Sequence, residues 1–196
     1  MSRLTANKAP AADAPPRFIF LVGARASGKT SLGQLLARAL HIPFADTDAR
    51  LQRTYGKTIA QIVAEDGWPV FRRYESCTLR ELPTVYPAGC VIATGGGIVL
   101  DATNRHFMRC TGTVLYLEAA ANLLEVRLRQ TPLDSQRPPL ADEPAANNMA
   151  CILATRRALY EETAHFRLHA ANPLPEICAH ALHLLRANPQ AGRETA

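Results

Sequence analysis

The sequence predicts an α/β fold with a parallel sheet covered by helices on both faces. Short apolar runs of strand length alternate along the chain with longer segments whose apolar residues recur at helical spacing. A glycine-containing stretch, GARASGKT at residues 23–30, lies between the first such run and the first such segment. Alternation of this kind places a ligand site beyond the carboxyl ends of the strands.

The first elements follow directly from the apolar pattern. The uninterrupted run at 17–23 predicts a buried strand, and the apolar spacing at 29–40 predicts a helix. A second strand is expected over 42–46, because FAD ends a short apolar run that follows a proline.

The centre of the chain predicts a broken helix and then a strand. Residues 58–83 have helical character but divide near Gly67, and Thr58 is a suitable N-cap. The run at 89–97 predicts a strand that leads into a glycine loop. The remaining predicted elements are helix, strand and helix over 101–109, 112–118 and 122–130, then helix, strand and helix over 154–164, 165–170 and 175–187.

The predicted folded region, 17–187, is a single domain. Residues 1–16 are rich in alanine and proline without periodicity, so we expect a disordered tail, and we expect the same of 188–196. No run is long enough to cross a bilayer and the N-terminus lacks a signal-peptide core, which favours the cytoplasm. The five cysteines are scattered without a C-x-x-C pair, which argues against a zinc site or a disulfide framework.

The charge pattern favours small anionic ligands over nucleic acid. The net charge is +5, but the arginines are spread along the chain and aromatic residues make up only 6%. Stacking platforms for bases are therefore scarce.

The stretch at 23–30 matches the phosphate-binding pattern G-x-x-x-x-G-K-[ST] in its required context, after a strand and before a helix. Backbone N–H groups of such a loop surround phosphate oxygens, and Lys29 reaches the β and γ phosphates. The Thr30 hydroxyl is expected to face Mg²⁺. The motif therefore predicts binding of a nucleoside triphosphate with Mg²⁺ through the loop and the start of its helix, namely Gly23, Ala26, Ser27, Gly28, Lys29, Thr30 and Ser31.

Two carboxylates follow the second strand in the segment FADTDAR. Side chains two apart on a strand share a face, so Asp46 and Asp48 are expected to lie close together. Like charges at such a distance need a cation between them or separate partners. The spacing alone leaves two alternatives open. Both carboxylates hold one metal ion, or each has its own role, which for Asp48 includes capping of the next helix.

Other segments of the chain indicate which class of phosphate-binding protein this is. The only Asn-Lys pair, at 7–8, precedes the loop, so a GTPase with a late N-K-x-D segment is disfavoured. Residues 131–146 are polar, proline-rich and contain Arg137, as expected of a lid that excludes water during transfer to a small acceptor. A solvated surface loop is the alternative.

The motifs GARASGKT, DTD, FRRYE, ATGGG, RPPL and RRALYEETA together resemble shikimate kinase in order and spacing, especially the second bacterial isozyme type, over residues 17–185. The resemblance implies the nucleoside monophosphate kinase type of fold, with a five-stranded parallel sheet of order 2-3-1-4-5. It implies transfer of the ATP γ-phosphate to the 3-hydroxyl of shikimate, on the route to chorismate and aromatic amino acids. A monomer is the family expectation.

The resemblance assigns separate roles to the two carboxylates. It implies that Asp46 faces Mg²⁺ with Thr30, and that Asp48 binds the acceptor hydroxyl and acts as general base. Arg72, oriented by Glu75, and Arg156 match the arginines that bind the acceptor carboxylate. The general alternative for each is a solvated helix face.

The resemblance also implies roles for the glycine loop and for the lid. It implies a substrate-binding region over about 47–82 and a lid over about 130–147, with Arg137 as a catalytic arginine on the ATP phosphates, while Arg129 would flank adenine. Lys29, Asp48 and Arg137 are thus the expected catalytic residues. The expected acceptor contacts in the glycine loop are Gly95, Gly96 and Gly97.

One departure and two rival functions accompany the resemblance. The loop has Ala26 where the family usually has glycine, and the added methyl restricts φ without blocking N–H donation. A gluconate-type sugar-acid kinase would share the phosphate loop and an anionic acceptor. A nucleotide-gated binding protein would bind ATP without acceptor-dependent release of ADP.

Overall fold

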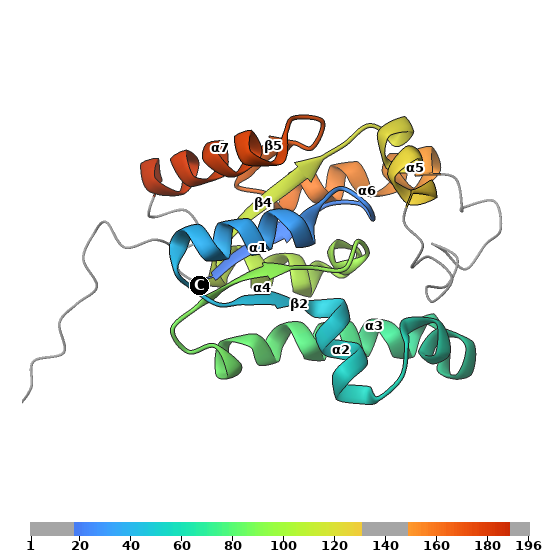
Figure 1. The fold of residues 1–196 in the computed structure, drawn as a ribbon. Coiled ribbons are helices and arrows are strands. Elements are labelled where there is room, and N and C mark those ends of the chain that lie inside the picture. The colour runs from blue at the N-terminus through green and yellow to red at the C-terminus, as the bar shows by residue number, and fades with distance from the viewer. Residues whose placement is uncertain (1–17, 131–148, 189–196) are drawn as a thin grey trace, which may run out of the picture.

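The computed structural model of the chain describes residues 18–130 and 149–188 (Figure 1). Five strands form one sheet of order β2-β3-β1-β4-β5, and all neighbouring pairs are parallel. The predicted sheet order is therefore confirmed. The strands are β1 (Phe18–Val22), β2 (Phe44–Asp46), β3 (Cys90–Ala93), β4 (Thr113–Glu118) and β5 (Phe166–His169).

Helices follow the strands in the predicted alternation. The helix α1 has the bounds that the apolar spacing predicted, whereas α6 begins earlier than the predicted residue 154. The helices are α1 (Lys29–Leu40), α2 (Thr47–Tyr55), α3 (Ile59–Val85), α4 (Ala102–Thr111), α5 (Ala121–Arg129), α6 (Met149–Thr163) and α7 (Leu174–Ala187), with a 3₁₀ turn η1 (Ile98–Leu100).

The central strand β1 is buried on both faces because its residues alternate between two cores. Phe18, Phe20 and Val22 belong to a core formed with α3, α4 and α6. Ile19 and Leu21 belong to the core formed with α1 and α7 on the opposite face. Figure 1 shows these two helix layers on either side of the sheet. An apolar strand without polar alternation is the pattern expected of a sheet covered on both faces.

The helices that flank the site begin and break where particular residues require it. The Thr58 hydroxyl accepts a hydrogen bond from the Gln61 N–H, and the Gln61 side chain accepts from the Thr58 N–H, so α3 starts with a capping box. Gly67 has φ 80° and ψ 166°, which interrupts α3 and divides it into two helical parts as predicted. Only glycine adopts this region without strain.

The start of α2 corrects one expectation. The helix begins at Thr47, and its N-cap is Asp46, whose Oδ1 accepts from the N–H groups of Asp48 and Ala49. Capping by Asp48 is therefore wrong. Asp48 lies in the first helical turn and not on the strand, so the two-residue strand periodicity does not apply to this pair.

Some predictions fall outside the described residues. These are the two terminal tails, apart from Asn188, and the lid with Arg137, apart from Gln130. Within the described ranges, no helix is both long enough and apolar enough to span a membrane.

Candidate active site

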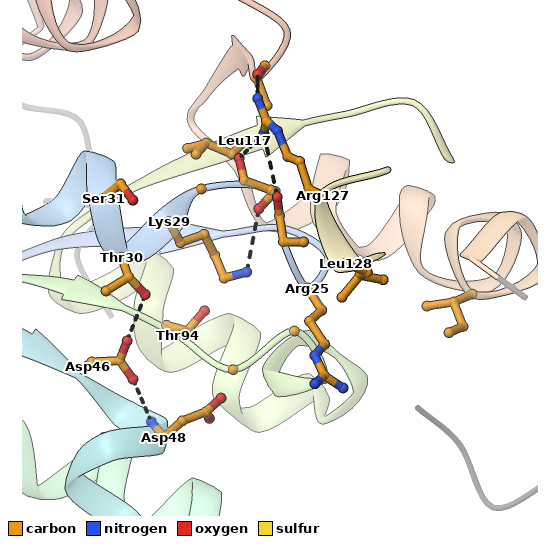
Figure 2. Close-up of a pocket in the computed structure, with 18 of the residues that line it drawn as sticks. Arg25, Lys29, Thr30, Ser31, Asp46, Asp48, Thr94, Leu117, Arg127 and Leu128 are labelled. Carbon is orange, nitrogen blue, oxygen red and sulfur yellow. Dashed lines mark hydrogen bonds between the residues drawn. The ribbon is translucent and has the colours of Figure 1, made fainter. Parts of the chain in front are cut away.

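A cavity of about 620 Å³ opens at the carboxyl ends of the central strands (Figure 2). It runs from the phosphate loop and α2 to the glycine loop after β3, and is bounded by α3, α5, α6 and the start of α7. Every predicted site residue in the described chain lines it, except Gly23 and Arg129. These residues are Ala26, Ser27, Gly28, Lys29, Thr30, Ser31, Asp46, Asp48, Arg72, Gly95, Gly96, Gly97 and Arg156.

The phosphate loop is held in shape by positive φ angles and by its own lysine. Gly23 and Gly28 have φ of 145° and 101°, and Ala26 has φ of 63°. An alanine in the left-handed region costs about 1–2 kcal/mol, so the loop tolerates strain at this position. The buried Lys29 ammonium donates to the carbonyls of Gly23 and Ala24, at 2.9 and 2.8 Å. Lys29 is thus fixed inside the loop, where its charge faces the phosphate cradle.

Thr30 and Asp46 meet although they come from different elements. The Thr30 hydroxyl, on the first turn of α1, donates to Asp46 Oδ2 at 2.9 Å (Figure 2). The second Asp46 oxygen caps α2, so this carboxylate is fixed through both atoms. A hydroxyl and a carboxylate beside a phosphate loop are hard oxygen ligands of the kind Mg²⁺ takes, together with its waters. Among the described residues, no group of three or more His, Cys, Asp or Glu side chains is placed to hold a metal ion.

Asp48 and Glu75 both approach Gly95 at the position where another residue would carry its Cβ. A Cβ atom added at Gly95 would stand 2.6 Å from Glu75 Oε1 and 2.7 Å from Asp48 Oδ1. The two carboxylate oxygens therefore lie in contact or within the span of one water molecule. The Gly95 N–H donates to the Thr47 hydroxyl at 3.0 Å. Gly95 thus makes room for two acidic side chains, while its N–H is engaged within the protein.

Arg72 is oriented by an acid, by aromatic rings and by a glycine. Its Nη1 donates to Glu75 Oε2 at 2.6 Å, one helical turn away on α3. Its guanidinium carbon lies 5.1 Å from the Trp68 ring centre and 5.0 Å from that of Phe71. A Cβ at Gly97 would overlap the guanidinium group itself. The predicted orientation of Arg72 by Glu75 is present, whereas the contributions of Trp68 and Gly97 were not predicted.

Burial is the main influence on the pKa of Glu75. The side chain is only 3% exposed, and this burial raises its pKa to about 7. The Arg72 guanidinium opposes the shift, and the negative charge of Asp48 adds to it. Glu75 therefore exchanges its proton near neutral pH, unlike an ordinary glutamate.

Gly96 is contacted from α6 and from the phosphate loop. The Arg156 Nη1 donates to the Gly96 carbonyl at 3.4 Å, and the buried Tyr160 hydroxyl donates to it at 2.5 Å. A Cβ at Gly96 would lie 3.3 Å from the Arg25 backbone nitrogen. Arg156 lines the cavity, whereas its neighbour Arg157 is exposed and pairs with Glu118 and Glu161.

Arg127 is a site residue that the sequence did not reveal. It lines the cavity from α5, and its two terminal nitrogens donate to Ser27 O at 3.2 Å and Ala170 O at 2.8 Å. It thereby connects the phosphate loop to the turn after β5. Arg129, which was expected to flank adenine, is exposed and is not among the residues that line the cavity. No spacing rule separates these two arginines in the same helical turn.

Known proteins of one family match most of this chain. The family model described as "Shikimate kinase" matches residues 25–186. "Shikimate kinase 2" of Sodalis glossinidius (strain morsitans) is 49% identical over 167 residues, covering 85% of this chain and 94% of the relative. The same-named protein of Yersinia enterocolitica serotype O:8 / biotype 1B (strain NCTC 13174 / 8081) is 47% identical over 167 residues, with the same coverage.

Two solved structures resemble this chain to different degrees, one as a member of the same family and one in its fold alone. The shikimate kinase from Acinetobacter baumannii in complex with shikimate has a TM-score of 0.79 and 33% identity, and the match covers 90% of this chain and 97% of that one. A gluconokinase from Sinorhizobium meliloti 1021 has a TM-score of 0.53 and only 19% identity over 89% of this chain and 94% of that one, so this likeness concerns the fold alone. The phosphate loop, the carboxylates of Asp46 and Asp48, and the two arginines line one cavity. Because the family model and the relatives match most of the sequence, the chain belongs to the shikimate kinase family.

Proposed function

We propose that the protein transfers the γ-phosphate of ATP to the 3-hydroxyl of shikimate, giving shikimate 3-phosphate and ADP. The observation that carries this proposal is that Asp48, Arg72 and Arg156 line the same cavity as the phosphate loop. A small anionic acceptor bound by the arginines would therefore lie beside the terminal phosphate. We further propose that the enzyme acts as a monomer in the cytoplasm, as the family resemblance implies.

The acceptor half of the cavity supplies binding and proton removal. The planar guanidinium of Arg72 suits two-point binding of a carboxylate, and Arg156 adds positive charge from α6. Asp48 is the carboxylate proposed to accept the proton of the attacking hydroxyl. A general base of this kind typically contributes about 10²–10⁴-fold to the rate.

The phosphate half supplies positioning and charge. Backbone N–H groups of the loop and of the α1 N-terminus would bind the β and γ phosphates, and Lys29 would exchange its loop carbonyls for phosphate oxygens. Thr30 and Asp46 are the residues that would hold Mg²⁺. When bound, this ion neutralises charge on the phosphates. Arg137, outside the described residues, is proposed to cover the phosphates during transfer.

Coupled measurement of ADP release tests the proposal. Shikimate should support turnover, whereas gluconate, other sugar acids and nucleoside monophosphates should not. Comparable turnover with gluconate would favour the sugar-acid kinase. Binding of ATP without ADP release on any acceptor would favour a nucleotide-gated binding protein.

A further inference from the structure

Glu75 carries a buried oxygen that the proposed chemistry does not use. Its Oε2 accepts from Arg72 at 2.6 Å, but Oε1, also buried, has no hydrogen-bond partner among the described residues. Glu75 lines the cavity beside Asp48, and Glu75 Oε1 and Asp48 Oδ1 both lie within 2.7 Å of the position that a Cβ at Gly95 would take. A buried carboxylate oxygen without a donor is costly, and a proton on the acid reduces that cost.

The charges that face Glu75 come from three helices. Arg72 is on its own helix, Asp48 is on α2, and Arg156 and the Tyr160 hydroxyl are on α6. Arg72 and Arg156 favour the ionised form, whereas burial and Asp48 favour the protonated form. These opposing effects leave the pKa of Glu75 at about 7. The described residues that line the cavity include no histidine, so Glu75 is their candidate for proton exchange near neutral pH.

We propose that Glu75 takes up a proton from solvent when the acceptor carboxylate binds to Arg72, so that acceptor affinity depends on the protonation of this acid. The inference rests on the proposed function for the identity of the acceptor, shikimate.

The physical reason is competition for one guanidinium group. In the free protein, Arg72 is paired with the Glu75 carboxylate at short range. An incoming carboxylate at Arg72 places a second negative charge beside Glu75, and like charges in a buried site favour protonation of one of them. The incoming acid, with an ordinary pKa near 4, stays ionised, so the proton goes to Glu75. Protonated Glu75 keeps a carbonyl oxygen for Arg72 and gains an O–H that can donate toward Asp48.

The sign of the pH dependence follows. Well below pH 7, Glu75 is already neutral, so binding takes up no proton and affinity is highest. As the pH rises through 7, Glu75 ionises in the free protein, and binding must restore its proton. Affinity therefore falls with rising pH until Glu75 is ionised in the complex as well. Each unit by which the acceptor raises the pKa of Glu75 corresponds to a tenfold change in Kd.

Calorimetric titration of the full chain with shikimate, without ATP or Mg²⁺, tests the proposal. At pH 7.5, titrations in PIPES and in Tris buffer should differ in apparent enthalpy by the amount that corresponds to net proton uptake. From pH 6 to pH 8.5, the Kd for shikimate should rise about tenfold. The uncharged methyl ester of shikimate is the matched ligand control, because it adds no charge at Arg72, so its weaker binding should show neither effect.

The variant Glu75→Gln separates proton uptake from a purely structural role. Glutamine imitates the neutral acid, so its Kd for shikimate should be flat with pH and close to the wild-type value at pH 6. A structural ion pair alone would instead make Glu75→Gln bind weakly at every pH. Glu81→Gln, on the same helix but 52% exposed at its side chain, is the control and should retain the wild-type profile.

The outcomes are distinct. A wild-type Kd that is independent of pH, equal enthalpies in the two buffers, or proton uptake that persists in Glu75→Gln would overturn the inference and leave the kinase function intact. If Glu75→Gln does not fold, the comparison of the acid with its methyl ester on the wild-type chain decides. Absence of shikimate binding and turnover at every pH would instead contradict the proposed function.

Discussion

The phosphate half and the acceptor half of the cavity are built in opposite ways. The core of the phosphate half is one loop that is continuous in sequence from Gly23 to Ser31, and its expected ligand groups are mainly backbone N–H groups plus Lys29, which is held by carbonyls of the same loop. The acceptor half is made of side chains from distant segments. Asp48, Arg72 and Arg156 are brought together only by the fold.

Because of this difference, the two halves of the cavity should respond differently to substitutions. A loop that binds through its backbone depends on a few φ angles, and most side-chain changes nearby leave those angles intact. A site made of converging side chains depends on each supporting contact, such as Glu75 and Trp68 around Arg72. Substitutions in the acceptor half should therefore alter catalysis or acceptor binding while ATP binding persists.

The largest effect is expected from Asp48→Asn. Asparagine keeps the size of the side chain but does not accept the proton of the attacking hydroxyl, so turnover should fall by about 10²–10⁴-fold. The Kd for ATP, measured by titration, should change little because Asp48 lies in the acceptor half. Near-normal turnover would remove Asp48 from the mechanism.

A smaller but selective effect is expected from Arg72→Ala. Loss of hydrogen bonds to a charged carboxylate costs about 1.5–3 kcal/mol, so the KM for shikimate should rise by roughly 10- to 100-fold while that for ATP changes little. The neighbouring Arg73 is exposed, and Arg73→Ala is the matched control with both constants near wild type. Equal increases for both substrates in Arg72→Ala would contradict its assignment to the acceptor carboxylate.

Gly97→Ala tests whether the glycine loop shapes the acceptor half by leaving space. The added methyl would displace the Arg72 guanidinium, which is the mobile end of a side chain, so the fold should persist. We expect the KM for shikimate to rise about tenfold, because small misplacements of a positioning group are costly. Gly96→Ala, whose methyl would lie 3.3 Å from the Arg25 backbone nitrogen, should raise the KM for ATP as well as that for shikimate, because it also presses on the phosphate loop. An equal effect of both variants on both substrates would mean that the two halves are not independent.

The smallest effect is expected from Ala26→Gly in the phosphate half. Glycine relieves the left-handed φ of 63° but loosens the unfolded chain, so thermal unfolding should show a gain of at most about 1 kcal/mol. Ala154→Gly in the exposed face of α6 is the control, where the same change should cost about 1 kcal/mol. A loss of stability in Ala26→Gly similar to that in the control would show that the loop bears no strain at this residue.

The sequence was sufficient where the chemistry is local. The strand-loop-helix context of 23–30, the N-cap at Thr58 and the break at Gly67 each depend on neighbouring residues, and each is confirmed. The role of Asp48 as a cap was wrong, because the chain turns into α2 earlier than the pattern suggested and Asp46 takes that position.

Residue order alone was enough to predict the alternation of strands and helices, the phosphate loop and, through the ordered motifs, the family. Three features emerge from the folded chain alone: Arg127 rather than Arg129 lines the cavity, Gly95 leaves room for two carboxylates, and Gly97 leaves room for Arg72. Helix caps and φ preferences depend on near neighbours in the chain, so the sequence alone reveals them. The burial of a charge, and the partners that face it, depend on which distant elements the sheet brings together.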